Sequence, residues 1–327
     1  MAGPTRPLTP EEKKRLERLE RSRKNRRGRV NPATMPDRLA RTAAFVPRRT
    51  NLSTDASFTR IYEVPGYSVV EVKGRELGSQ HRDALVALFR LPRSKIVVEN
   101  PNYRKGAFMA PSHVYYETRT TWRELLIRMN RTQHVNNLMT LLGTFQDIQQ
   151  VIILVHEGRS LDEIERMDRK RAQRALLANA DQRGGSSAVI NDISWEGLQL
   201  DSEVRVQFGT AVLNAIEKAH LVSINANVQF KLKSDYAKSF WPYIDSQPNH
   251  SYIDEDRLAQ LAGADMKTFT NAQRSQFRKD CRQAFNDMVT AGGLLEWSNE
   301  ERGAGRIKAH RYHYRHALPR QGELGLV

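Results

Sequence analysis

The sequence predicts an α+β protein in which two tandem units follow a disordered basic arm. Three observations lead to this prediction. Residues 1–50 combine high positive charge with scattered prolines, and two later stretches each place amphipathic helices before a segment of strand length. Helices followed by a β-hairpin are the element order of a winged helix, so we expect winged-helix units at 51–233 and 234–327.

The composition indicates a globular protein that binds a polyanion. Hydrophobic residues make up 39% of the 327 residues, which is enough for a buried core. The net charge of +15 and the pI near 10.0 point to a polyanionic partner. Cys281 is the only cysteine, which excludes an internal disulfide and a cysteine-based zinc site. Without a secretory signal or a run of about 18 apolar residues, we expect a cytoplasmic protein.

The arm has few residues to bury. Residues 1–49 carry 15 Lys or Arg and 5 Asp or Glu, a net charge of +10. A short charged helix fits Glu11–Lys24, with only Leu16 and Leu19 to bury, and prolines at 4, 7, 10, 32, 36 and 47 favour disorder. Two interpretations stay open: an arm that binds phosphates without sequence preference, or a solvated tail.

The first unit begins with helices. One is expected over Arg82–Leu91, before Pro92, and a second starts at a capping box formed by Thr121 and Glu124. A third buries Leu138, Leu141, Leu142, Phe145 and Ile148, and Val151–Val155 follows as a strand.

The rest of this unit is less regular. A charged stretch at 159–182, ending at 184–187, is predicted to be an insertion. Strands are expected around Val189–Ile193 and Val204–Phe208, with a helix near Gly209–Ala219. Val222–Leu232 alternates apolar and polar residues and predicts the clearest strand, just before a domain boundary near Lys233.

The second unit opens with an aromatic helix that Ser234 or Asp235 caps and that Pro242 kinks or ends. Asp254 is expected to cap a short helix that Gly263 closes. A basic helix over Thr270–Val289 follows. Its predicted core face consists of Phe277, Cys281, Ala284, Phe285 and Met288.

The neighbouring face of this basic helix carries Ser275, Arg278, Lys279, Arg282 and Asn286, whereas Asp280 and Asp287 point elsewhere. After Gly292-Gly293 come a strand-like Leu294–Trp297 and a run rich in Arg, Lys, His and Tyr over Ile307–His316. A helix that enters a DNA major groove would have this pattern, as would an ordinary amphipathic helix with a solvated charged side. The overall charge and the element order favour the first interpretation.

We expect Arg278 and Arg282, one turn apart, to make bidentate contacts with guanine. Arg274, Ser275 and Lys279 are expected to reach bases or phosphates, and the hairpin residues to reach phosphates or the minor groove. About eight phosphate contacts would give a log–log salt slope of about −7. The full set of predicted DNA-binding residues is Lys267, Arg274, Ser275, Arg278, Lys279, Arg282, Arg306, Lys308, His310 and Arg311.

Catalytic alternatives have weaker support. Gly184-Gly185 and Gly292-Gly293 lack the lysine of a phosphate-binding loop, which argues against an ATP-driven enzyme. His310, His313 and His316, with Tyr312 and Tyr314 between them, do not form the histidine pair that a metal-dependent nickase needs. Asp162, Glu163 and Glu165 suit a solvated helix better than acid–base catalysis. We therefore expect no enzyme activity, no metal and no cofactor.

Several segments resemble plasmid replication initiators of the RepA/TrfA type. In the second unit these are Ala237–Ile244, Leu258–Gly263, Phe277–Phe285 and Leu294–Glu296, and in the first unit Trp122–Leu126. The resemblance spans about Arg60 to His316 in layout and is strongest over the last third. The arm and the charged insertion lie outside it.

The resemblance implies a protein that binds repeated sites, called iterons, in a plasmid origin and helps to open adjacent AT-rich DNA. It also implies recruitment of the host DnaA initiator and the replicative helicase in the bacterial cytoplasm, and a homodimer in equilibrium with the initiating monomer. The second winged helix would read the major groove, and the first would contact phosphates and form the dimer interface. The chief alternative is a dimeric winged-helix transcriptional repressor that binds one palindrome.

Overall fold

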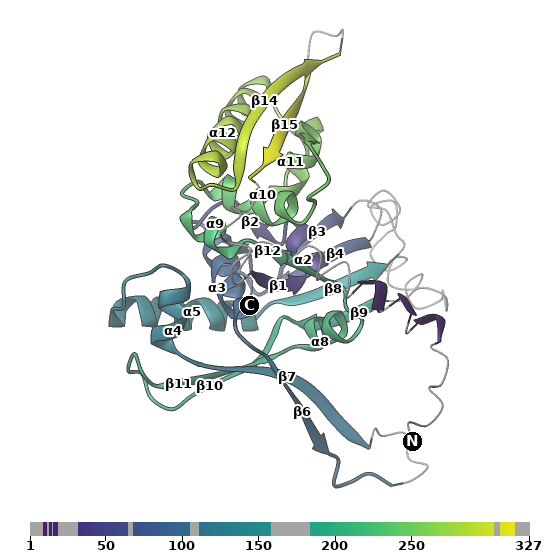
Figure 1. Cartoon of the computed structure of the whole chain (residues 1–327), viewed down its shortest axis with the longest axis vertical. Helices are drawn as coiled ribbons and strands as arrows, with labels where there is room; N and C mark the ends of the chain where they lie inside the picture. Colours follow the sequence, from purple (N-terminus) through teal and green to yellow (C-terminus); the bar gives the residue numbers. More distant parts are fainter. Residues whose placement is uncertain are drawn as a thin grey trace, which may run out of the picture.

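The structure, a computed structural model, describes residues 9–11, 13–14, 16–18, 32–64, 68–104, 111–157, 184–303 and 308–317. It is an α+β protein, as predicted, with a sheet-rich lower part that carries a smaller upper part of helices and a long hairpin (Figure 1). Within these ranges, every helix is too short or too polar to cross a membrane.

Three helices form the core of the lower part: α3 (Ser79–Arg90), α4 (Trp122–Arg128) and α5 (Val135–Gln149). All three predicted helices are thus confirmed. The Thr121 hydroxyl accepts a hydrogen bond from the Glu124 amide at 3.2 Å, which starts α4. The Glu124 carboxylate turns to Thr120 and Arg128 instead of returning to Thr121, so only half of the predicted capping box forms.

Two antiparallel sheets complete the lower part. The first has the order β3 (Phe58–Val64), β4 (Ser68–Gly74), β8 (Ile152–Glu157), β9 (Gly184–Ala188). The second has the order β10 (Ile190–Trp195), β11 (Glu203–Phe208), β7 (Ser112–Thr121), β6 (Ser94–Glu99), and its β6–β7 hairpin extends away from the body (Figure 1). The predicted strands at 151–155, 189–193 and 204–208 are confirmed, as is the helix near 209–219, which is α8 (Thr210–Glu217). The predicted insertion at 159–182 lies outside the described residues, and 184–187 belong to β9.

The predicted disordered arm extends too far. Residues 33–46 form β1 (Ala33–Pro36), α2 (Asp37–Arg41) and β2 (Phe45–Val46). β1 pairs with β12 (Leu221–Ile224), and β2 pairs in parallel with β5 (Leu77–Gly78). Ala33, Met35 and Phe45 are fully buried. The strand partners of this short apolar segment lie far along the chain, so local charge and proline content wrongly predicted disorder for it.

Earlier in the arm, the described residues between 10 and 18 are helical, in agreement with the short charged helix expected there. Arg18 donates a hydrogen bond to the Lys218 carbonyl at 3.0 Å, so this segment contacts the end of α8.

The strand predicted at Val222–Leu232 is wrong beyond its first residues. The chain leaves β12 after Ile224 and forms α9 (Ala226–Lys231). The Asn225 side chain accepts a hydrogen bond from the Val228 amide at 3.3 Å and so caps this helix. The six residues of α9 are too few for an alternating pattern to exclude a helix, and the Asn225 cap favours the helix over a strand.

The upper part consists of α10 (Asp235–Asp245), β13 (Tyr252–Asp254), α11 (Glu255–Leu261), the 3₁₀ turn η1 (Met266–Thr268), α12 (Asn271–Thr290), β14 (Leu294–Arg302) and β15 (Ala309–His316). Its strands form one antiparallel sheet of order β13-β15-β14. Ser234 caps α10, and Gly263, at φ +73°, ends the turn after α11, as predicted. Asp254 precedes α11 without capping it, because its carboxylate binds Arg311.

Pro242 neither ends nor breaks α10, which continues to Asp245. A proline lacks the amide that would bond to the carbonyl four residues earlier, here Lys238. That carbonyl instead accepts from the Gln229 side chain of α9 at 3.4 Å. The tertiary contact replaces the missing helical bond.

The predicted boundary near Lys233 falls between α9 and α10, where buried polar groups join the two parts. Lys238 of α10 forms an ion pair with Asp83 of α3, and both side chains are over 90% buried. The fully buried Arg82 donates to the carbonyls of Ser239 and Thr42, each at 3.1 Å. Burial lowers the pKa of Arg82 to about 10. The upper part is therefore seated on α3.

Candidate nucleic-acid interface

The helix α12 is fixed at its start and along one face. The Thr270 hydroxyl accepts from the Gln273 amide at 3.3 Å, and the Gln273 side chain accepts from the Thr270 amide at 2.8 Å, a complete capping box. The predicted core face is confirmed, since all five of its residues are at least 97% buried: Phe277, Cys281, Ala284, Phe285 and Met288. A helix held this way presents its opposite face in one orientation.

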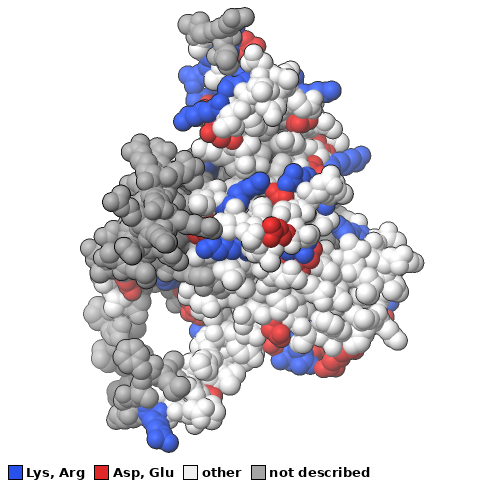
Figure 2. All heavy atoms as spheres, turned by 180° about the vertical axis from the view of Figure 1, so that it is seen from behind, with Lys and Arg blue, Asp and Glu red and all other residues white. Residues whose placement is uncertain are grey.

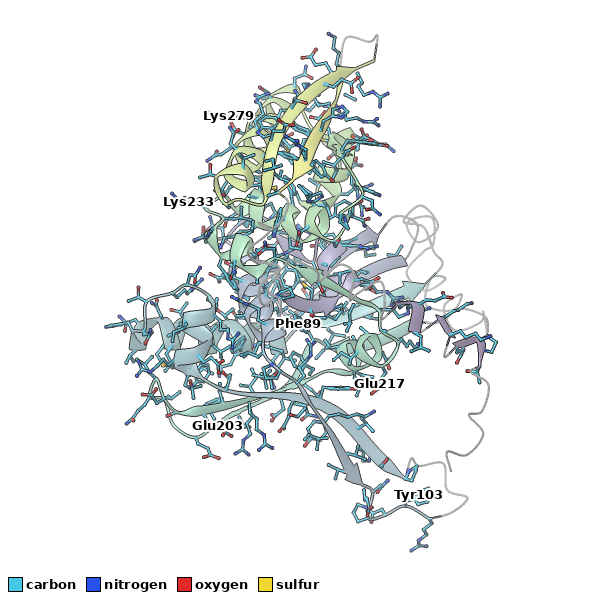
Figure 3. The ribbon with its side chains drawn as sticks, viewed as in Figure 1. Phe89, Tyr103, Glu203, Glu217, Lys233 and Lys279 are labelled. Atoms are coloured by element: carbon cyan, nitrogen blue, oxygen red, sulfur yellow. The ribbon has the colours of Figure 1, made fainter. Side chains whose placement is uncertain are left out.

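That opposite face is exposed and has no carboxylate. We call it the outer face of α12, and it consists of Asn271, Ser275, Lys279, Arg282 and Asn286. Figure 3 places Lys279 at the edge of the upper part, with Lys233 below it on the same side. The two acids of α12 point elsewhere: Asp280 accepts from the Gln276 side chain at 2.9 Å, and Asp287 accepts from the amides of Lys233 and Ser234 at 2.7 and 2.8 Å. The outer face can therefore offer cations and hydrogen-bonding groups to an anionic partner.

The hairpin β14–β15 packs beside α12 on an aromatic base. Tyr312 stacks on Phe285 with ring centroids 5.1 Å apart, and the ring centroids of Trp297 and Tyr314 lie 5.5 and 6.1 Å from that of Phe285. Trp297 also donates to the Asn286 side chain at 2.8 Å. The base of the hairpin is thus rigidly joined to the helix, while Ser298–Arg302 are exposed.

A hollow of about 640 Å³ opens between α12 and the hairpin. We call it the basic hollow, because four of its eight lining residues are Arg or Lys and one is Glu: Asn271, Arg274, Ser275, Arg278, Arg282, Glu301, Lys308 and His310. Figure 2 shows Lys and Arg side chains around this upper end of the molecule, seen from behind. The outer face and the basic hollow are contiguous, since Asn271, Ser275 and Arg282 belong to both.

The structure shows Arg278, one of the two arginines expected to contact guanine, engaged in an ion pair. Its guanidinium binds the buried Glu255 carboxylate, with Nε to Oε1 at 2.5 Å and Nη2 to Oε2 at 3.0 Å, and only 19% of the side chain is exposed. Hydrogen bonding to Glu255 raises the pKa of Arg278. A guanidinium engaged in this way is not free for a bidentate contact with guanine, which leaves Arg282 as the exposed arginine of the predicted pair.

Arg274 is held in a similar way. It donates to the carbonyls of Met266 and Phe269 at 2.6 and 3.3 Å, and so fastens η1 to α12. Its predicted contact with a base requires these bonds to break. Lys267 of η1 and Ser275 of α12 are exposed, as expected, and their DNA contacts stay predictions.

The hairpin residues differ from expectation. His310 is buried, and its ring bonds to the Asn299 side chain, so its predicted phosphate contact, which stays a prediction, requires the ring to leave this position. Burial lowers the pKa of His310. Arg311 binds Asp254 through two hydrogen bonds, at 2.7 and 3.0 Å, and covers the Tyr252 ring at 3.9 Å. Lys308 pairs with Glu301 at 2.9 Å but stays half exposed, and Arg306 lies outside the described residues.

Sequence reasoning missed Asn271 of the outer face and the acceptor role of Glu255. Asn271 sits on the same helical arc as Ser275 and Arg282, so extending the arc to the first turn would have found it. Nothing local marks Glu255, because its partner Arg278 is 23 residues away.

The two tyrosines between the histidines of β15 are core residues. Tyr312 is fully buried and Tyr314 is 5% exposed, and burial raises the pKa of both hydroxyls. In the described ranges, no group of three His, Cys, Asp or Glu side chains is placed to hold a metal ion.

No family model matches the chain, and no curated protein matches its sequence. Solved structures do match. A crystal structure of domains 2 and 3 of RctB has a TM-score of 0.53 at 9% identity, covering 86% of this chain and 99% of that one. A second crystal structure of RctB domains 2–3 has a TM-score of 0.48 at 9% identity, covering 88% and 98%. The Pi initiator protein in complex with iteron DNA has a TM-score of 0.42 at 12% identity, covering 61% of this chain and 80% of that one. The chain therefore has the fold of RctB domains 2 and 3, and the predicted resemblance to replication initiators is confirmed at the level of the fold.

Proposed function

We propose that this chain is a plasmid replication initiator that binds repeated origin sites through α12 and the hairpin β14–β15. The main support for the proposal is the outer face of α12. It is exposed, rigidly backed, free of carboxylates and continuous with a basic hollow. These are the properties that a helix needs to enter the major groove while its hairpin follows the phosphates.

The element order of the upper part supports a winged helix. Helix α10, strand β13, helices α11 and α12 and the hairpin follow one another as this fold requires, with α12 as the recognition helix. In the lower part, α3, α4 and α5 followed by β8 support a second winged helix. Tandem units of this kind suit a protein that covers one repeat of an origin.

The remaining parts of the proposal come from the resemblance. The chain would open AT-rich origin DNA, recruit the host DnaA initiator and replicative helicase, and exchange between homodimer and monomer in the bacterial cytoplasm. We propose no enzymatic step, metal or cofactor. The burial of Tyr312 and Tyr314 supports this part, because neither hydroxyl can reach a DNA phosphate without disrupting the aromatic base.

Selection of bound fragments from random duplexes, followed by footprinting, tests the proposal. We expect directly repeated, regularly spaced protection, whereas one protected palindrome would favour the dimeric repressor. In the variant K279A/R282A, we expect selective binding to fall at least about 100-fold, because each lost base or phosphate contact costs about 1–3 kcal/mol. A control variant, K73A/K218A, removes two cations of the lower part and should bind like the wild type. Equal binding by the two double variants would refute the role of α12.

A further inference from the structure

The Glu255 carboxylate connects three segments that are distant in sequence. It is the first residue of α11, and its side chain is 3% exposed. It accepts from Arg278 of α12 at 2.5 and 3.0 Å, and from the backbone amide of His310 in β15 at 3.2 Å. A buried carboxylate with three donors is a strong, directional junction.

Arg278 extends this junction to the start of the hairpin's second strand. Its Nη2 also donates to the Lys308 carbonyl at 2.6 Å. Lys308 and His310 flank Ala309, where β15 begins. The carboxylate and the guanidinium together fix the backbone on both sides of Ala309, at the turn end of the hairpin, where Ala309 pairs with Arg302.

We propose that Glu255 is a positioning residue, which sets the separation between the hairpin and α12 and hence the width of the basic hollow. This inference rests on the proposed function. The exposed end of β14, Ser298–Arg302, lies beyond the aromatic base, and a two-stranded ribbon alone is marginally stable. Its direction is therefore decided by the contacts that hold this far end of the hairpin, and Glu255 supplies them, because Glu301 and Arg302 of β14 pair with His310 and Ala309 of the strand that Glu255 and Arg278 bind. Glu255 itself is too buried to touch DNA.

Charge alone makes the opposite prediction for Glu255. Removing a carboxylate near a DNA-binding surface strengthens the attraction of phosphates, so a purely electrostatic role predicts tighter binding by E255Q. A positioning role predicts weaker binding, because the hairpin no longer holds its place. Whether E255Q binds DNA more tightly or more weakly therefore distinguishes an electrostatic role of Glu255 from a positioning role.

Glu301 supplies a matched control. It lines the same hollow and is 53% exposed, and its carboxylate binds the Lys308 side chain, whereas the Glu255 carboxylate binds Arg278 and the His310 amide. E301Q removes the same charge and leaves the bonds to Glu255 intact. We expect E301Q to bind DNA slightly more tightly than the wild type, because the hollow loses a carboxylate and Lys308 loses its ion pair.

The test measures amide hydrogen exchange of the full chain without DNA, and then binding to a selected duplex and a random duplex over a salt series. In E255Q we expect the amides of β15, His310 first, to exchange at least about tenfold faster. Selective affinity should fall about tenfold, and the salt slope should shrink by about one as a hairpin phosphate contact is lost. If E255Q does not fold, R278K replaces it. A lysine keeps the charge but cannot bind Glu255 and Lys308 together, so the same changes are expected.

Three results would overturn the inference: E255Q matching E301Q in exchange and binding, tighter selective binding by E255Q, or a fall in affinity with unchanged hairpin exchange. A wild-type chain without selective DNA binding would instead refute the proposed function. The exchange measurement needs no DNA, so it still decides whether Glu255 positions the hairpin.

Discussion

The two long helices, α5 and α12, have similar surroundings and different outer faces. Each follows a shorter helix, precedes a strand and buries an apolar stripe, with Phe145 and Phe285 fully buried. The α12 outer face holds Lys279 and Arg282, whereas α5 has no Lys or Arg and exposes Val135 and Met139. The buried stripe fixes where each helix lies, and the outer face decides what it can bind. Recognition of bases is therefore expected at α12 and not at α5.

The largest expected effect tests the similarity of the two helices. F145A and F285A each leave a large cavity, so we expect each to lower the free energy of unfolding by about 3–5 kcal/mol. The buried Lys238–Asp83 pair and Arg82 join the two parts, so both variants should lower the midpoint of a single transition. Denaturant unfolding followed by circular dichroism measures this. Separate transitions, each moved by one variant, would show that the parts unfold independently.

A second pair of variants tests the difference between the helices. S275D and T140D add the same charge to exposed positions of α12 and α5. A carboxylate on the surface that meets phosphates costs binding energy, so S275D should weaken DNA binding at least about tenfold. T140D should change it less than about threefold. Titration of a labelled duplex measures both, and comparable losses would mean that α5 also contacts DNA.

Sequence periodicity predicted the helices well, because burial of one face imposes a spacing that each segment shows locally. The stripe of α12 from Phe277 to Met288 and the stripe of α5 from Leu138 to Ile148 were both found this way. Periodicity failed at α9, where the Asn225 cap overrode an alternating pattern. It also failed at β1, whose strand partner β12 is about 190 residues away.

The candidate site was predicted in outline but not in detail. The position of a cation on a helical arc says that it is near the surface, not whether an acid elsewhere in the chain engages it. Arg278 and Arg282 look alike in sequence, and only the packing of α11 brings Glu255 to one and not to the other. Arg311 is engaged by Asp254 for the same reason. Local pattern therefore identifies the helix, and tertiary contacts decide which of its charges are free.

The smallest expected effect concerns two histidines, one beside each helix. His81 is fully buried and 3.2 Å from Asp147 of α5, and His310 is buried beside Arg278 of α12. Burial lowers the pKa of both imidazoles below the ordinary value of 6.5. The unfolded chain then takes up these protons at a higher pH than the folded chain, so stability is complete above pH 6.5 and declines as the pH falls below it.

Denaturant unfolding between about pH 7.5 and about pH 5.5 measures this decline. H310Q removes one titrating group, so the loss of stability on acidification should be smaller in H310Q than in the wild type. The effect of His81 should remain, because its ring lies against α5 and not against the hairpin. A wild-type chain that gains stability over this range would contradict the direction. An unchanged pH dependence in H310Q would show that His310 does not contribute to the loss of stability.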